Sequence, residues 1–149
     1  MEIGNHSDEV YMRVALEEAR SAYAEGEVPI GAVVVCNGKI IGRAHNRVEA
    51  LQDVTAHAEL LAITSASEYL GSKFLSDCSL YVTVEPCTMC ATAIGWARVR
   101  RLVYGCSEVK YGYSHLAGEQ VLHRSCEVSR ELLADECASL MQSFFRSRR

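Results

Sequence analysis

Two short motifs in this chain of 149 residues contain side chains that bind soft metal ions. His57 and Glu59 form a His-x-Glu motif, and Pro86, Cys87 and Cys90 form a Pro-Cys-x-x-Cys motif. One imidazole and two thiolates suit Zn²⁺, and three protein ligands leave a coordination position open for water, whereas structural zinc sites use four. The two motifs together therefore predict a catalytic site that holds one Zn²⁺ per chain, with His57, Cys87 and Cys90 as the ligands.

Glu59 supplies a carboxylate two residues from the proposed histidine ligand. Residues two apart do not share a helix face, so Glu59 is expected to approach the site from a different direction than His57. Both motifs together are typical of zinc-dependent nucleobase deaminases, which replace a ring amine by oxygen from water. Glu59 is therefore the candidate catalytic residue, taking a proton from water and passing it to the ring nitrogen and the leaving ammonia.

A Cys-x-x-Cys motif alone is also compatible with a redox pair or with half of a structural zinc site. A closed site would need a fourth cysteine or histidine. The other five cysteines each stand alone in apolar stretches, which is typical of small core residues; they are Cys36, Cys78, Cys106, Cys126 and Cys137. The three-ligand interpretation is therefore favoured.

Composition indicates a soluble globular protein, and the length suits a single domain over residues 1–149. Hydrophobic residues make up 49% and charged residues 23%, with no apolar run of membrane-spanning length and no secretory start. Seven cysteines cannot all pair within the chain, which favours a reduced, cytoplasmic setting.

The net charge of −4 does not indicate nucleic-acid binding overall. Positive charge gathers locally in two groups: Arg98, Arg100 and Arg101, and then Arg146, Arg148 and Arg149.

Strand and helix patterns alternate along the chain, which predicts an α/β sandwich with a central sheet between two helix layers. Asn37-Gly38 is a strong signal for a tight hairpin turn. Polar or irregular segments at 44–54 and 110–115 are expected to be loops. Strands are expected over 30–36, 39–42, 80–84, 99–104 and 126–128, and helices from Ser7 to about Gly26, over 56–70 and 87–97, and near the C-terminus around Leu133 to Phe144.

Beyond the two motifs, the chain resembles the bacterial tRNA-specific adenosine deaminases over nearly its whole length. The matching segments are 27–33, 53–59, 80–87, 133–137 and 144–146. The resemblance implies a cytidine-deaminase-like three-layer α/β/α sandwich with a five-stranded mixed sheet. It also implies a homodimer whose subunits complete each other's substrate groove. The apolar residues Ile94 and Trp96, on the helix expected after the cysteine pair, support a homodimer. The implied reaction converts the wobble adenosine of an arginine tRNA anticodon stem-loop to inosine.

The resemblance also assigns substrate contacts and marks two departures. Asn46 would hydrogen-bond the flipped nucleoside, and Val28 and Pro86 would help to wall the pocket. Glu108 stands where the family more usually has Asp, and residues 111–115 replace small residues. Both departures lie in the region expected to touch the anticodon loop.

Two other functions remain open from the sequence. A deaminase acting on a free base or nucleoside, of the guanine or cytosine type, would carry the same metal motifs. A non-catalytic zinc-bearing partner subunit would also carry the ligands, but it would have no need of Glu59.

Overall fold

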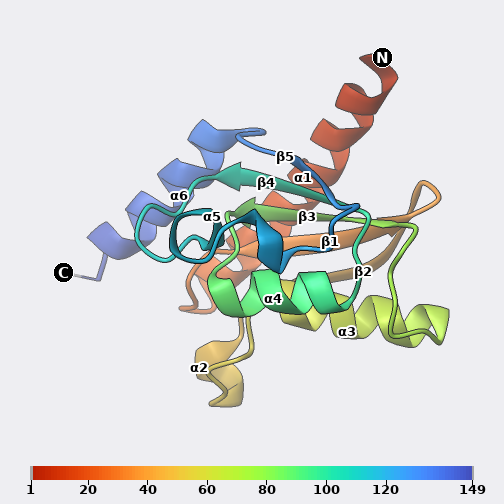
Figure 1. Ribbon diagram of the computed structural model, residues 1–149. Helices are drawn as coiled ribbons and strands as arrows, with labels where there is room; N and C mark the ends of the chain where they lie inside the picture. The colour runs from red at the N-terminus through yellow and green to blue at the C-terminus, as the bar shows by residue number, and fades with distance from the viewer. Residues whose placement is uncertain (1, 149) are drawn as a thin grey trace.

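Five strands form one mixed sheet in the order β2-β1-β3-β4-β5 (Figure 1). The computed structural model describes residues 2–148, and the side chains of residues 7–148. Strand β1 is antiparallel to both β2 and β3, whereas β3, β4 and β5 are parallel to one another. The expectation of a five-stranded mixed sheet is confirmed. The strands are β1 Gly31–Cys36, β2 Lys39–His45, β3 Cys78–Val84, β4 Arg101–Cys106 and β5 Glu127–Ser129.

Helices cover both faces of the sheet, as Figure 1 shows. Helices α1 (Glu2–Ala24) and α6 (Ala134–Arg146) pack on one face, and α3 (Ala58–Leu70) and α4 (Thr88–Trp96) pack on the other. Because successive residues of a strand point to opposite faces, Val33 and Val103 face α1 while Val34 and Leu102 face the α3–α4 layer. The three-layer α/β/α sandwich predicted from the sequence is confirmed.

Small residues let α3 lie close to strand β2. A Cβ at Gly42 would come within 2.6 Å of the carbonyl oxygen of Ala62, so this strand position admits no side chain. The facing helix positions Ala58, Ala62 and Ala66 are also small and fully buried. This close approach fixes the height of α3 over the sheet, and with it the residues at the start of α3.

Strand β2 runs three residues beyond the predicted end at Gly42. The Asn37-Gly38 turn forms as predicted, with φ angles of 51° and 74°. Pairing then continues until His45 lies opposite Gly31, across a bulge near Val34 and Val35. Asn46 consequently lies just beyond the sheet at the edge where β1 begins.

Two segments predicted as loops contain short helices. They are α2 (Val48–Leu51) and α5 (Tyr113–Leu116), and a 3₁₀ turn, η1 (Glu119–Val121), follows. The carboxylate of Glu27 accepts hydrogen bonds from the first N–H groups of α2, and that of Glu85 accepts one from α5. Because these carboxylates come from more than twenty residues away in sequence, the local pattern does not reveal the helices.

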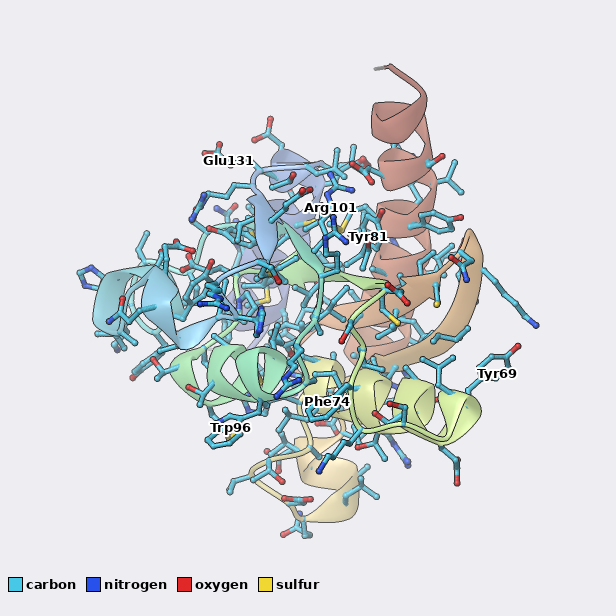
Figure 2. The ribbon with its side chains drawn as sticks, turned by 45° about the vertical axis from the view of Figure 1, so that its right-hand side comes forward. Tyr69, Phe74, Tyr81, Trp96, Arg101 and Glu131 are labelled. Carbon is cyan, nitrogen blue, oxygen red and sulfur yellow. The ribbon has the colours of Figure 1, made fainter. Side chains whose placement is uncertain are left out.

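The predicted start of the first helix at Ser7 is wrong, because α1 begins at Glu2. The carboxylate of Asp8, within α1, accepts hydrogen bonds from Arg101 and from the Tyr81 hydroxyl. Figure 2 shows Tyr81 and Arg101 close together beside α1. Among the helices that the structure describes, none is both long and apolar enough to cross a membrane.

Candidate active site

The sheet topology collects the candidate residues at one edge. Because β3 and β4 are parallel, the segments after Val84 and Cys106 leave the sheet on the same side. Strand β1 is antiparallel to β3, so the segment before Gly31 and the end of β2 also lie there. The segments that contain Val28, Asn46 and Cys87 therefore meet at this edge.

The three candidate zinc ligands converge where α3 and α4 begin. His57 and Cys87 have extended backbone and immediately precede these helices, rather than lying in the first turn as predicted, while Cys90 is in the first turn of α4. His57 Nδ1 lies 3.8 Å from Cys87 Sγ and 3.4 Å from Cys90 Sγ. Zinc bonds of about 2.0–2.3 Å in tetrahedral geometry separate ligand atoms by about 3.5 Å, so this set fits the ion.

In the described part of the chain, this is the one cluster of three histidine, cysteine or acidic side chains that could hold a metal ion.

The thiol of Cys90 and the imidazole of His57 hydrogen-bond to Cys87 and lower the pKa of Cys87 to about 4, although burial opposes the shift. The same bond to Cys87 raises the pKa of Cys90, and that of His57 also lies above its ordinary value. The hydrogen bonds within the cluster therefore favour the thiolate form of Cys87, which is the ligand form of cysteine.

Glu59 lies next to this cluster with its carboxylate inside the protein. The residue is 3% exposed, and its Oε1 has no hydrogen-bond partner among the described residues. Burial raises the pKa of Glu59 to about 7. Because an unpaired buried carboxylate oxygen is costly, it marks a position where a ligand or water is expected to supply the partner.

Asn46 and Val28 line a common cavity of about 470 Å³, together with Glu27, Phe144 and Arg148. The Oδ1 atom of Asn46 accepts a hydrogen bond of 2.7 Å from the N–H of Ala58. This bond leaves the amide nitrogen as the end that can donate to a ligand. Pro86 is buried and does not line this cavity, so the structure brings two of the three predicted pocket residues together.

The described members of the two arginine groups lie at opposite ends of the strands. Arg98 and Arg100 precede β4, away from the candidate site, and Arg101 is paired with Asp8. Arg146 and Arg148 are exposed at the end of α6, where Arg146 shares a cavity with Glu108. Arg149 lies outside the described residues.

The departures from the family pattern differ in exposure. Tyr113 is fully buried and packs edge-on against Tyr104, so its side chain is not available to a ligand. Tyr111 is 57% exposed, and Glu108 accepts hydrogen bonds from the N–H groups of Lys110 and Tyr111. Of the two apolar residues assigned to a subunit interface, Ile94 is a core residue at 1% exposure, whereas Trp96 is 79% exposed.

Sequence reasoning assigned no role to Glu27 and Glu85, two buried carboxylates at the same edge. Glu27 holds α2 through the N–H groups of Glu49 and Ala50, and Glu85 holds the segment after β4. Each stands directly before a predicted pocket residue, Val28 or Pro86. A charged residue next to a pocket position is the signal that could have identified them.

Comparisons with known proteins agree with this geometry. Residues 5–106 match the family described as cytidine and deoxycytidylate deaminase zinc-binding region. A tRNA-specific adenosine deaminase of Agrobacterium fabrum is 46% identical over 143 residues, which cover 93% of this chain and 94% of the relative.

Two solved structures are similar in fold. One comes from work on A-to-I editing by tRNA:A34 deaminases at the wobble position of transfer RNA; it is 46% identical with a TM-score of 0.82, covering 87% of this chain and 97% of that chain. The other is a guanine deaminase from Nitrosomonas europaea, 28% identical with a TM-score of 0.81, covering 91% and 83%.

Proposed function

We propose that this chain, which belongs to the tRNA-specific adenosine deaminases within the zinc-binding cytidine and deoxycytidylate deaminase family, converts the wobble adenosine of a tRNA anticodon to inosine. The observation that carries the chemistry is the unpartnered, buried oxygen of Glu59 beside a cluster of one imidazole and two thiols. A non-catalytic subunit would gain nothing from this costly carboxylate.

The reaction consumes adenosine and water and yields inosine and ammonia. Bound zinc supplies a Lewis acid that makes water a nucleophile at neutral pH. Glu59 accepts a proton from the attacking water and delivers it to the ring nitrogen of the base. It then takes the second proton from the hydroxyl that has been added to the ring carbon and passes it to the amine, which departs as ammonia. One buried carboxylate thus serves as both base and acid.

Asn46 and Val28 are suited to hold the target nucleoside. The amide nitrogen of Asn46 donates to the nucleoside while Ala58 fixes the other end of the amide. Val28 supplies an apolar wall in the same cavity, and Pro86 packs next to the Cys87 ligand. An adenosine in a single-stranded anticodon loop reaches this site at the smallest cost, because little stacking is lost when the base is flipped out.

Exposed cations at the site edge suit an RNA substrate. Arg146 and Arg148 lie at the end of α6, and the guanidinium of Arg148 is held 4.5 Å from the centre of the Phe144 ring. Phosphate contacts from these two arginines add affinity that does not depend on base sequence. The anticodon stem-loop thereby becomes the preferred substrate over a free base.

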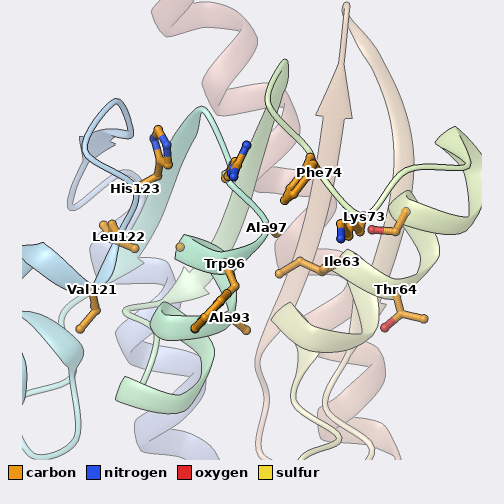
Figure 3. A pocket seen from close by; sticks show the side chains of 13 residues that line it. Ile63, Thr64, Lys73, Phe74, Ala93, Trp96, Ala97, Val121, Leu122 and His123 are labelled. Atoms are coloured by element: carbon orange, nitrogen blue, oxygen red, sulfur yellow. The ribbon is translucent and has the colours of Figure 1, made fainter.

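A homodimer forms, in this proposal, through an exposed apolar stripe on α4. Met89, Ala93 and Trp96 are spaced to lie on one face of the helix, and Met89 and Trp96 are 38% and 79% exposed. Figure 3 shows Ala93 and Trp96 in a cavity of about 920 Å³ whose far wall includes Ile63 of α3. Cys87 and Cys90 lie at the start of the same helix, so a second subunit on this face would sit close to the metal ligands.

We assign the 149 residues to one deaminase domain that works in the cytoplasm on tRNA. A reducing compartment suits the site, because Cys87 and Cys90 must stay free of disulfides to bind zinc. All seven cysteines are free in the structure.

Inosine formation in an anticodon stem-loop tests the proposal. The zinc-loaded protein should deaminate a stem-loop with adenosine at the wobble position faster than guanine, cytosine or cytidine. Glu59→Gln should retain zinc and fold but lose activity by about 10²–10⁴-fold, because the amide cannot relay a proton. Faster turnover of guanine, as for the guanine deaminase that this fold resembles, would overturn the substrate assignment and leave the metal site intact.

A further inference from the structure

Glu85 has a buried carboxylate that binds the segment from residue 107 to residue 114, here called the rim loop. Glu85 is 5% exposed. Its Oε1 accepts a hydrogen bond of 3.1 Å from the N–H of Glu108, and its Oε2 accepts bonds of 3.0 and 2.6 Å from the N–H and hydroxyl of Ser114. One carboxylate therefore joins both ends of the rim loop to the end of β3.

The backbone binds the same two segments together. The N–H of Tyr113 donates to the carbonyl of Pro86 at 3.0 Å, and Cys87 and Gly112 form an isolated β-bridge. A Cβ at Gly112 would lie 2.5 Å from Oε2 of Glu85 and 2.4 Å from the carbonyl oxygen of Glu108. The rim loop thus packs directly on the segment that contains the Cys87 ligand, with no space between them.

No cationic side chain pairs with Glu85 among the described residues. The carboxylate of Glu85 is surrounded by neutral donors only. Both of its oxygens must therefore accept hydrogen bonds to offset the cost of burying it. An amide in its place has one acceptor only, and its N–H₂ group would face the donor N–H of Glu108 or of Ser114. The contact is therefore specific for a carboxylate.

The rim loop is fixed at its base and exposed at its tip. Val109 and Tyr111 are 84% and 57% exposed, and Lys110 Nζ lies 5.3 Å from the centre of the Tyr111 ring. Glu108 lines a cavity of about 410 Å³ together with Phe145 and Arg146 of α6. An aromatic ring, a cation and this cavity are thus presented together at the site edge. Figure 1 shows the backbone of this segment leaving the end of β4 beside the end of β3.

We propose that Glu85 is a positioning residue that holds the rim loop against the Pro86-Cys87 segment, so that the loop tip contacts RNA in register with the metal site. This inference rests on the proposed function, because it takes an anticodon stem-loop as the ligand. Glu85 itself touches neither the RNA nor the metal. It sets the fraction of molecules whose rim loop is in the binding-competent position.

Binding of the anticodon stem-loop to a Glu59→Gln variant tests the role of Glu85 without turnover of the RNA. Adding Glu85→Gln to that background should weaken the Kd for the anticodon stem-loop roughly tenfold, as expected if about one molecule in ten keeps the competent loop. Zinc content should remain about one per chain, and exchange of the Glu108 and Ser114 amide hydrogens should become faster. Glu68→Gln makes the same chemical change at an exposed site on α3 and should alter none of these quantities.

Gly112→Ala tests the same contact from the loop side. Its methyl group would push the rim loop away from Glu85, so the Kd for the stem-loop should rise as it does in Glu85→Gln. Because both changes break the same contact, the Kd of the double variant should be about that of the weaker-binding single variant. If Glu85→Gln fails to fold, Ser114→Ala removes only the hydroxyl donor and should give a smaller rise in Kd together with faster loop exchange.

The outcomes separate this inference from the proposed function. A wild-type protein that does not deaminate the stem-loop contradicts the proposed function. If the wild type is active but Glu85→Gln lowers thermal stability and leaves the Kd and the loop exchange unchanged, Glu85 only supports the fold and the inference is wrong.

Discussion

His57 and Cys87 occupy the positions just before two helices, and this placement matters for their chemistry. Both residues have extended backbone, and a hydrogen bond from the backbone N–H of Cys90 helps to lower the pKa of Cys87. The partial positive charge of a helix start favours the thiolate over the thiol. Zinc ligation and helix initiation thus reinforce each other, and Glu59 lies one residue inside α3, where it approaches the cluster from another side.

Loss of the two thiols should remove the metal. Purified wild-type protein is expected to contain about one zinc per chain, and Cys87→Ser with Cys90→Ser should contain almost none, because a single imidazole is left to hold the ion. Atomic absorption on dialysed protein measures this. Cys126→Ser changes a half-buried cysteine outside the cluster and should leave the zinc content unchanged. Full zinc retention in the double variant would refute the ligand assignment.

At the level of elements, the sequence predicted the features that depend on neighbouring residues. The Asn37-Gly38 turn, the apolar strands and the helices after each metal motif all follow from local patterns. Features created by contacts distant in sequence were missed. Helices α2 and α5 depend on Glu27 and Glu85, and Arg101 was counted with a cationic group although it pairs with Asp8.

The end of strand β2 is attached to α1 by a histidine between two carboxylates. His45 Nδ1 lies 2.7 Å from Glu18, and its Nε2 lies 3.0 Å from Glu25, while Arg43 also binds Glu18. Burial lowers the pKa of His45, but hydrogen bonds to Glu18 and Glu25 raise it by a larger amount. The pKa of His45 therefore lies above the ordinary value of 6.5. The protonated form is therefore the one that the fold stabilises.

This shift predicts a pH-dependent effect of His45→Gln on stability. A raised folded-state pKa gives stabilisation that is complete below the unfolded pKa and is lost as the pH rises through the folded pKa. The variant should therefore lose more stability relative to wild type at about pH 6 than at about pH 9. Urea unfolding at both values measures the difference. An equal loss of stability at both pH values would contradict the ion-pair account.

The end of α6 should control the salt dependence of RNA binding. If Arg146 and Arg148 each neutralise one phosphate of a single-stranded loop, changing both to Ala should reduce the slope of log K against log salt by about 1.4. Fluorescence anisotropy with the stem-loop over a salt series measures the slope. Arg100→Ala with Arg124→Ala removes the same charge at the opposite edge of the sheet and should leave it unchanged. Equal slopes in both double variants would exclude α6 from the RNA surface.

Across the whole molecule, the site and the exposed face of α4 are connected by a single helix. The carboxyl ends of β3 and β4, the start of β1 and the end of β2 together hold the metal cluster and the cavity of Asn46. Helix α4 leads from that cluster to Trp96, which projects away from the sheet in Figure 2. The predicted contribution of Ile94 to an interface is wrong because that side chain faces the sheet in the core.

Trp96→Glu should convert a dimer to a monomer. A stable interface buries about 1,200–2,000 Å² in total, more than Trp96 alone can supply, so the contact must extend along α4 and onto Ile63 of α3. A buried charge at the centre of such an interface is costly, and an exposed large aromatic is a frequent source of binding energy. Sedimentation velocity at micromolar concentration should therefore show a dimer for wild type and a monomer for the variant.

Val10→Glu places the same charge on α1, on the opposite face of the sheet, and should remain dimeric. A wild-type protein that is monomeric and fully active would refute the dimer, whereas a dimeric Trp96→Glu variant would place the interface on another face.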